Sequence, residues 1–285
     1  MRSTKDIKRK INSIKNTQKI TKAMKMVAAA KLRRAQSAFD KTKPYADSIR
    51  KMTNNLAYAV EDISHPYFYA GTSAKKLFVV VTSDRGLCGA FNSNILKMFN
   101  NISKDYNKKD LIALPVGRVG YNALTRNNFE VVHPFTNYLG KIFYNDAKKI
   151  ASNIKNMYID GEIGEVNIIY NTFKSIAVQQ PTCFKLLPVE LVREDEFEQA
   201  SYIFEPAPEK LLSDLVERYV DFTIYNKLLE STVGEHGSRM VAMDNATRSA
   251  GDMINRYILS YNKARQAAIT TEILDIVNCS EALNK

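Results

Sequence analysis

The last 77 residues, from Glu209 to Lys285, contain no proline. From Met240 onward, apolar and small residues recur at alternating spacings of three and four, which is the pattern of a coiled-coil seam. The seam positions are Met240, Met243, Thr247, Ala250, Ile254, Tyr257, Tyr261, Ala264 and Ala268. A continuous helix of this length extends on the order of 100 Å, which is wider than one globular core. Such a helix needs a partner along its length.

The N-terminal segment is the candidate partner. The first 70 residues contain no glycine and only two prolines, Pro44 and Pro66. They carry the same alternating spacing at Ile7, Ile11, Ile14, Gln18, Thr21, Lys25, Ala28, Leu32, Ala35 and Phe39. We therefore predict a helix from about Thr4 to about Ala59. It should kink near Pro44, because proline removes one helical hydrogen bond and crowds the preceding turn.

The middle of this first seam is polar. Gln18, Thr21 and Lys25 occupy three successive seam positions, whereas the neighbouring row of Ile20, Met24 and Val27 is apolar. We expect the neighbouring row to supply the apolar face there, so that the apolar stripe rotates around the helix.

The stretch between Lys75 and Lys185 alternates between strand and helix patterns. The predicted strands are 77–81, 111–116, 129–132, 165–170 and 178–187, and the predicted helices are 91–102, 119–126 and 146–158. This alternation indicates a mainly parallel sheet with helices on its faces. An acidic segment, 193–198, and Pro206 and Pro208 then form a linker back to the C-terminal helix.

The predicted fold class is therefore α/β, with a Rossmann-like α/β domain inserted between two long terminal helices that form an antiparallel coiled coil. Residues 1–70 form the N-terminal coiled-coil helix, 71–208 the α/β domain with its linker, and 209–285 the C-terminal coiled-coil helix.

Positive charge is concentrated in one segment. The whole chain has a net charge of +11, and residues 1–43 alone hold 14 Lys and Arg against two Asp. An acidic partner is expected, and one alternative is a nucleic-acid-binding coiled coil, which would bind in a salt-dependent way. Against this alternative, apolar rows interleave with the lysines, and no aromatic residue precedes Phe39 to stack on bases.

The cysteine pattern and the hydropathy exclude some classes of protein. Cys88, Cys183 and Cys279 are odd in number and widely spaced, which argues against a disulfide framework. No apolar run approaches the length of a membrane span, and the start of the chain lacks an apolar signal-peptide core. These features favour a reducing compartment.

The turn after the first strand reads S-D-R-G-L-C-G, from Ser83 to Gly89. It lies where α/β folds bind phosphates, so an enzyme with a nucleotide here is a second alternative, testable by saturable nucleotide binding. However, the turn lacks the spacing of dinucleotide and P-loop motifs, and Asp84 would repel a phosphate. We favour a structural turn formed by Asp84, Arg85, Gly86 and Gly89, in which the two glycines allow unusual backbone angles.

No residue set predicts catalysis, a metal or a cofactor. The three histidines, His65, His133 and His236, lie in different segments without carboxylates or cysteines at ligand spacing. The Glu235-His236 pair could support acid–base work, but a solvated helix face is the preferred interpretation. Cys88 is interpreted as a small buried residue in a tight turn.

Two further stretches carry a family resemblance. N-T-Q-K-I-T-K-A-M-K-M-V-A-A-A-K, from Asn16 to Lys31, and Y-N-K-A-R-Q-A-A-I-T-T-E-I-L-D, from Tyr261 to Asp275, resemble the gamma subunits of rotary ATP synthases. The S-D-R-G-L-C-G turn matches too, as does the order of the parts over essentially the whole chain.

The resemblance implies a non-catalytic rotor. The paired helices would stand inside a ring of alpha and beta subunits, and the α/β domain would meet the epsilon subunit and the c ring. Torque would pass between the c ring and the catalytic ring, with membrane contact only through partners. The absence of a targeting peptide favours the cytoplasmic face of a bacterial plasma membrane.

The resemblance also implies roles for particular residues. It places Met24, Lys25, Arg265 and Gln266 at contacts with beta subunits, and Tyr202 and Glu205 at the foot near the c ring. Two departures stand out: Cys279-Ser280 replaces the family's Gly-Ala near the tip, and the cysteine-bearing insertion of chloroplast members is absent. Redox control by that insertion is therefore not expected.

Overall fold

The computed structural model describes residues 4–60, 63–137, 142–191, 205 and 207–283. The chain forms two compact units. One comprises Met1–Val27 and Met240–Lys285, and the other comprises Ala28–Arg239. Both long helices contribute to both units, and each unit has its own apolar core.

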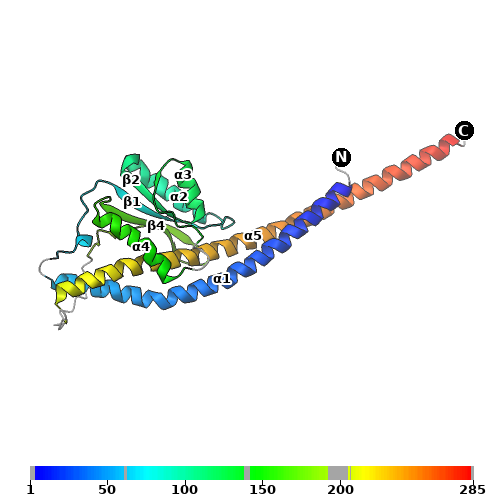
Figure 1. Ribbon diagram of the computed structural model, residues 1–285. Coiled ribbons are helices and arrows are strands. Elements are labelled where there is room, and N and C mark those ends of the chain that lie inside the picture. Colours follow the sequence, from blue (N-terminus) through cyan, green and yellow to red (C-terminus); the bar gives the residue numbers. More distant parts are fainter. Residues whose placement is uncertain (1–3, 61–62, 138–141, 192–204, 206, 284–285) are drawn as a thin grey trace. The chain divides into compact units, whose positions relative to one another are not determined.

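The two long helices have nearly the predicted bounds. Helix α1 spans Thr4–Ala59 and helix α5 spans Pro208–Leu283 (Figure 1). Pro44 lies inside α1 and does not end it.

The larger unit contains a five-stranded sheet. Its strands are β1 (Lys76–Val81), β2 (Leu111–Val116), β3 (Glu130–Val131), β4 (Glu165–Phe173) and β5 (Gln179–Leu187). Their order is β3-β2-β1-β4-β5. The first four strands are mutually parallel, as predicted, whereas β5 runs antiparallel to β4 because a short hairpin joins them.

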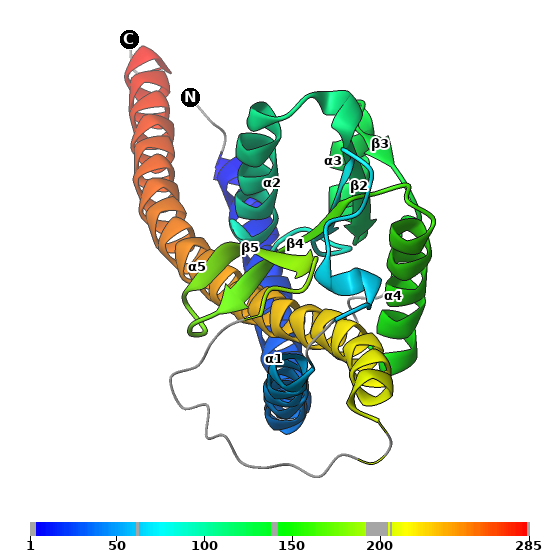
Figure 2. The same cartoon turned by 90° about the vertical axis from the view of Figure 1, so that its left-hand side faces the viewer.

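Helices cover both faces of this sheet (Figure 2). Helices α2 (Phe91–Ile102) and α3 (Arg118–Arg126) lie on one face, and α4 (Tyr144–Ile159) and the first part of α5 lie on the other. Alternate residues of β1 enter the two cores: Phe78 and Val80 face α2 and α3, whereas Leu77 and Val79 face α4 and α5. Three short 3-10 turns, Pro66–Phe68, Ser103–Asp105 and Lys108–Asp110, complete the unit.

The smaller unit is an antiparallel helix pair. Ile7, Ile11 and Ile14 of α1 pack against Ala250 and Ile254 of α5, and all five are buried. Residues later in α1 contact residues earlier in α5, as Lys25 contacts Asp244. The predicted antiparallel coiled coil is therefore confirmed.

The predicted rotation of the apolar stripe is wrong. Ile20 and Val27 are exposed by 60% and 57%, whereas Thr21 is buried and faces α5. The polar residues stay on the seam because they find hydrogen-bond partners on the opposite helix, which offsets their loss of water. The apolar row is left on the outer surface of the pair.

Candidate functional site

A layer of polar side chains crosses the helix pair. The Thr247 hydroxyl donates to the Thr21 Oγ1 at 2.8 Å, and the Gln18 side-chain amide donates to the Thr247 carbonyl at 3.3 Å. One turn further along, Lys25 Nζ lies 2.6 Å from Asp244 Oδ1. The seam is thus apolar at Ile7–Ile14, polar in the middle, and apolar again from Ala28.

Asp244 receives two cations. Lys25 binds its Oδ1, and Arg248 binds its Oδ2 at 2.5 Å. Hydrogen bonds from Lys25 and then from Arg248 hold the pKa of the Asp244 carboxyl below its usual value. Lys25 therefore joins the two helices, a contact that the sequence pattern did not predict.

The other residues expected at beta-subunit contacts lie on the surface of the pair. Met24 is half-buried, and Arg265 and Gln266 are exposed. Arg265 and Gln266 lie off the seam, whereas the seam residue Ala264 packs against the apolar core of the helix pair. Ala268, the last expected seam position, is exposed in the structure.

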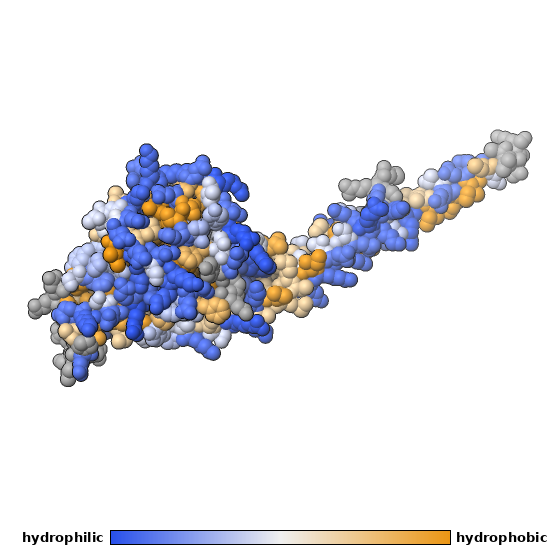
Figure 3. Space-filling view, viewed as in Figure 1, coloured by the Kyte–Doolittle hydropathy of each residue, from blue (hydrophilic) through white to orange (hydrophobic). Residues whose placement is uncertain are grey.

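Beyond Ala264, α5 presents apolar side chains to solvent. Figure 3 shows them along the last part of the helix. Their exposed fractions lie between 47% and 69% at Ile269, Ile273, Leu274, Ile276 and Val277. Apolar surface gathered on one helix in this way marks a site of contact with another protein.

In the turn from Ser83 to Gly89, only one of the two glycines is needed for the backbone conformation. Gly89 has a φ of 59°, in the left-handed region that favours glycine. Gly86 has no such angle, and a Cβ there would meet no atom within 4 Å. Leu87 takes the second left-handed position instead, with a φ of 62° and an exposed side chain. The predicted role of Gly86 is therefore wrong.

Asp84 occupies the position where a nucleotide phosphate would be expected. Its Oδ1 accepts hydrogen bonds from the backbone N–H of Arg118 at 3.0 Å and of Asn137 at 2.9 Å. Arg118 is the first residue of α3, so the carboxylate sits at a helix N-terminus, which favours negative charge. The protein's own carboxylate fills this anion site, which argues against the nucleotide alternative.

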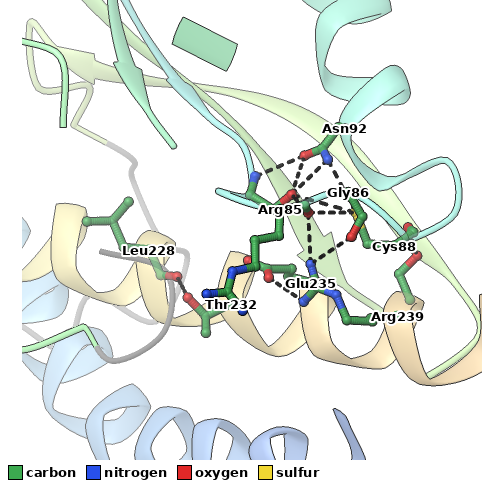
Figure 4. A network of polar contacts seen from close by, with 10 residues as sticks. Arg85, Gly86, Cys88, Asn92, Leu228, Thr232, Glu235 and Arg239 are labelled. Atoms are coloured by element: carbon green, nitrogen blue, oxygen red, sulfur yellow. Dashed lines mark hydrogen bonds and ion pairs between the residues drawn. The ribbon is translucent and has the colours of Figure 1, made fainter. Parts of the chain in front are cut away.

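Helix α5 fastens the same turn from the other side (Figure 4). Arg239 Nη2 donates to the Arg85 carbonyl at 3.0 Å and reaches the Gly86 carbonyl at 3.4 Å. Ser238 Oγ donates to the Cys88 carbonyl at 2.6 Å. Within the turn, Cys88 is buried as predicted, and burial raises the pKa of its thiol.

Glu235 and His236 do not form a solvated helix face, so that prediction is wrong. Their exposed fractions are 4% and 2%. Burial raises the pKa of the Glu235 carboxyl to about 7 and lowers the pKa of the His236 imidazole to about 4. Among the residues described, neither belongs to a group of side chains that could hold a metal ion.

A signal for this buried stretch was present in the sequence. Gly234 and Gly237 interrupt a long helix, where glycine is unfavourable. A Cβ at Gly234 would lie 3.3 Å from Gln179, and one at Gly237 would lie 3.3 Å from the Ile176 carbonyl. Two glycines three residues apart thus mark the close approach of α5 to the β4–β5 hairpin.

The expected foot is only partly described. Glu205 is exposed and lies just before α5. Tyr202 lies outside the described residues. None of the helices in the described part of the chain is both long and apolar enough to cross a membrane.

Comparison with known proteins decides the family. A family model described as ATP synthase matches residues 3–283. The ATP synthase gamma chain of Desulforamulus reducens is 42% identical, covering 99% of this chain and all of the relative. The gamma chain of Bdellovibrio bacteriovorus is 43% identical, covering 99% of both.

The chain belongs to the ATP synthase gamma chain family. Gamma chains are subunits of the ATP synthase complex and are not catalytic by themselves. The relatives named here are all ATP synthase subunits, and none supports the nucleic-acid alternative. Consistent with this, α1 is not a free basic arm, because its apolar seam packs against α5.

Solved structures agree with the gamma chain fold. A chain of the Tetrahymena thermophila mitochondrial ATP synthase central stalk and c ring is 30% identical, with a TM-score of 0.62 over 80% of this chain and 99% of that chain. A chain of the Euglena gracilis mitochondrial enzyme is 17% identical, with a TM-score of 0.71 over 98% and 94%. The second likeness concerns the fold alone.

Proposed function

We propose that this chain is the rotating shaft of a proton-driven ATP synthase on the cytoplasmic face of a bacterial plasma membrane. Its helix pair turns within the ring of alpha and beta subunits, and its α/β domain turns with the c ring. The chain itself performs no chemistry. It carries torque between the two rings.

The observation that carries the proposal is the unpaired end of α5. Its apolar residues between Ile269 and Val277 are exposed, although a helix in water buries its apolar face against a partner. The bore of an alpha/beta ring would cover this helix on all sides. Ile269, Ile273, Ile276 and Val277 recur at the spacing of one helix face, and Leu274 lies beside them, so they form one broad apolar surface for a partner to cover.

The middle of the helix pair gives the shaft its asymmetry. The outer surface of α1 carries Ile20 and Val27 among exposed lysines, whereas the neighbouring stretch of α5 carries Asp244 and Asp252. A shaft with different sides makes different contacts with each beta subunit it faces. Differential contact of this kind is what shifts a partner between conformations.

Four residues are proposed to touch beta subunits during rotation. Met24 and Lys25 lie on α1, and Arg265 and Gln266 lie on α5. Exposed or half-exposed side chains suit this role, because contacts that form and break in each turn must be individually modest. The positive charge of α1 suits an acidic surface on beta.

The foot of the shaft is proposed to meet the c ring and the epsilon subunit. Glu205 is exposed at the start of α5, and Tyr202 precedes it in the sequence. The chain would reach the membrane only through these partners.

Co-assembly tests the proposal. The full-length chain is mixed with alpha and beta subunits of the same organism, any complex is isolated, and its ATPase rate is compared with that of alpha and beta alone. A complex with fewer copies of this chain than of beta, and with a raised ATPase rate, is expected. Failure of a folded chain to assemble would overturn the proposal.

A further inference from the structure

The turn from Ser83 to Gly89 is held on α5 by two adjacent side chains. Ser238 binds the Cys88 carbonyl, and Arg239 binds the carbonyls of Arg85 and Gly86 (Figure 4). All of these residues lie in the larger unit. Two of the three hydrogen bonds come from one guanidinium, so the position of the turn depends on the orientation of Arg239.

Glu235 sets that orientation. Its Oε1 lies 2.5 Å from Arg239 Nη1, one helical turn earlier on α5. The two side chains are only 5% and 13% exposed. One nitrogen of the guanidinium is therefore anchored to the carboxylate, while the other reaches the turn.

The carboxylate that anchors Arg239 is incompletely bonded. Glu235 Oε2 is buried and accepts no hydrogen bond from any described residue. An ionised oxygen buried without a donor is unfavourable, and a proton on it would remove that penalty. The site is therefore built to take up a proton.

Charged groups from three elements act on Glu235. Arg239 on its own helix and Lys31 on α1 favour the ionised carboxylate, whereas Asp84 in the turn disfavours it. The neutral thiol of Cys88 lies close enough to Glu235 for the two groups to interact electrostatically. Burial outweighs the two cations and raises the pKa of the carboxyl to about 7.

A partly buried carboxylate, Glu165, shows the contrast. Glu165 accepts hydrogen bonds at both oxygens, from Asn167 at 2.7 Å and from Lys76 at 2.9 Å. Burial acts to raise its pKa, but these two bonds hold the pKa below its usual value. Both oxygens of Glu165 are thus hydrogen-bonded, whereas only one oxygen of Glu235 is.

We propose that Glu235 and Arg239 form a protonation-controlled latch between the 83–89 turn and α5. The ionised carboxylate holds the guanidinium over the turn and keeps it closed. A proton taken from solvent onto Oε2 removes the charge that anchors Arg239, and the turn loosens. Loss of that proton restores the latch. The proposal concerns this chain alone and does not depend on the proposed rotor function.

Hydrogen exchange of the backbone tests the latch. Exchange of a peptide covering residues 83–92 is followed in the full-length chain between about pH 6 and pH 8.5 and corrected for the intrinsic pH dependence of amide exchange. Protection of this peptide should rise on the order of tenfold toward the higher pH, as a charge-assisted hydrogen bond is gained. A peptide in the core strand β1 should not change.

Two variants isolate the carboxyl group. Glu235→Gln is neutral at every pH, so its 83–92 peptide should have low protection with no pH dependence. Glu230→Gln is the matched control, because Glu230 is also buried on α5 but accepts a hydrogen bond from Phe173 N at 3.1 Å. The control should keep the wild-type pH profile at 83–92.

Infrared difference spectra of the wild-type chain, titrated over the same range, check the proton itself. A protonated carboxyl band should appear as the pH falls toward about 7 and below, since this is the pKa of Glu235. A flat wild-type exchange profile would overturn the latch, and so would a carboxyl that titrates only near its ordinary value. A Glu235→Gln variant with the wild-type profile would overturn it too.

Discussion

Thr21 and Thr247 face each other across the helix pair with their hydroxyl oxygens 2.8 Å apart. The Thr21 hydroxyl donates its own hydrogen bond to the Gln18 carbonyl at 3.1 Å, so both hydroxyls are hydrogen-bonded. Two polar residues thus occupy adjoining seam positions without an unbonded group. The contact joins residues 226 positions apart in the sequence.

This pair should show energetic coupling. Thr21→Val and Thr247→Val each remove one hydroxyl, whereas the double variant removes both and leaves isosteric apolar groups in contact. We expect the double variant to be more stable than the sum of the single effects predicts, with a coupling of about 0.5–1.5 kcal/mol. Urea unfolding of the four proteins, followed by circular dichroism, measures it. Thr270→Val is the control, since that hydroxyl bonds only the Gln266 carbonyl on its own helix; additive effects in the Thr21–Thr247 cycle would contradict the prediction.

Gly117→Ala should strongly destabilise the larger unit. Gly117 has a φ of 102°, and a Cβ there would lie 2.2 Å from the Thr82 carbonyl oxygen. Strain and overlap together should reduce the free energy of unfolding by more than about 3 kcal/mol. Gly86→Ala, where a Cβ meets open space, should change it by less than about 0.5 kcal/mol. Thermal or urea unfolding compares the two variants. Similar losses in the free energy of unfolding would contradict a special role for the close approach at Gly117.

His236 should make the protein less stable in mild acid. Burial lowers its pKa to about 4, whereas an unfolded imidazole takes up a proton near the ordinary histidine pKa of 6.5. As the pH falls from about 6.5 toward 4, the unfolded state binds a proton that the folded state does not, so stability is lost. The loss between about pH 6.5 and pH 5 should be about 2 kcal/mol larger for the wild type than for His236→Gln. Urea unfolding at both pH values measures it. Glu235 is present in both proteins and cancels from the comparison, and parallel pH profiles would exclude the effect.

Arg265→Ala combined with Gln266→Ala should impair coupling rather than folding. Both side chains are exposed, so their loss should change the free energy of unfolding by less than about 1 kcal/mol. If they contact beta subunits, ATP synthesis by the assembled enzyme should fall by about tenfold or more, as for loss of contacts at an interface. The comparison is with Asn255→Ala plus Arg256→Ala, two exposed positions on the paired part of α5. Equal losses of synthesis and stability would show that Arg265 and Gln266 are merely structural.

The amino-acid sequence by itself determined the elements and much of their arrangement. The seam from Met243 to Ala264, the bounds of α2 and β2, and the mainly parallel character of the sheet all follow from local periodicity. Periodicity records which face of an element is buried, and apolar residues mark that face directly. The sequence also showed that Ser83–Gly89 lacks a phosphate-binding motif, because such motifs depend on residues in one short stretch.

Only the tertiary structure decided where polar groups are buried. Thr21 faces α5 because the Thr247 hydroxyl donates a hydrogen bond to it there, and Glu235 is buried because α5 passes under the 83–89 turn and the β4–β5 hairpin. The energy of burying a polar group depends on partners that are far away in the sequence, so no local pattern reveals it. Leu87 takes the left-handed angle expected of Gly86 for a similar reason, since the turn's path is fixed by Asn92, Ser238 and Arg239.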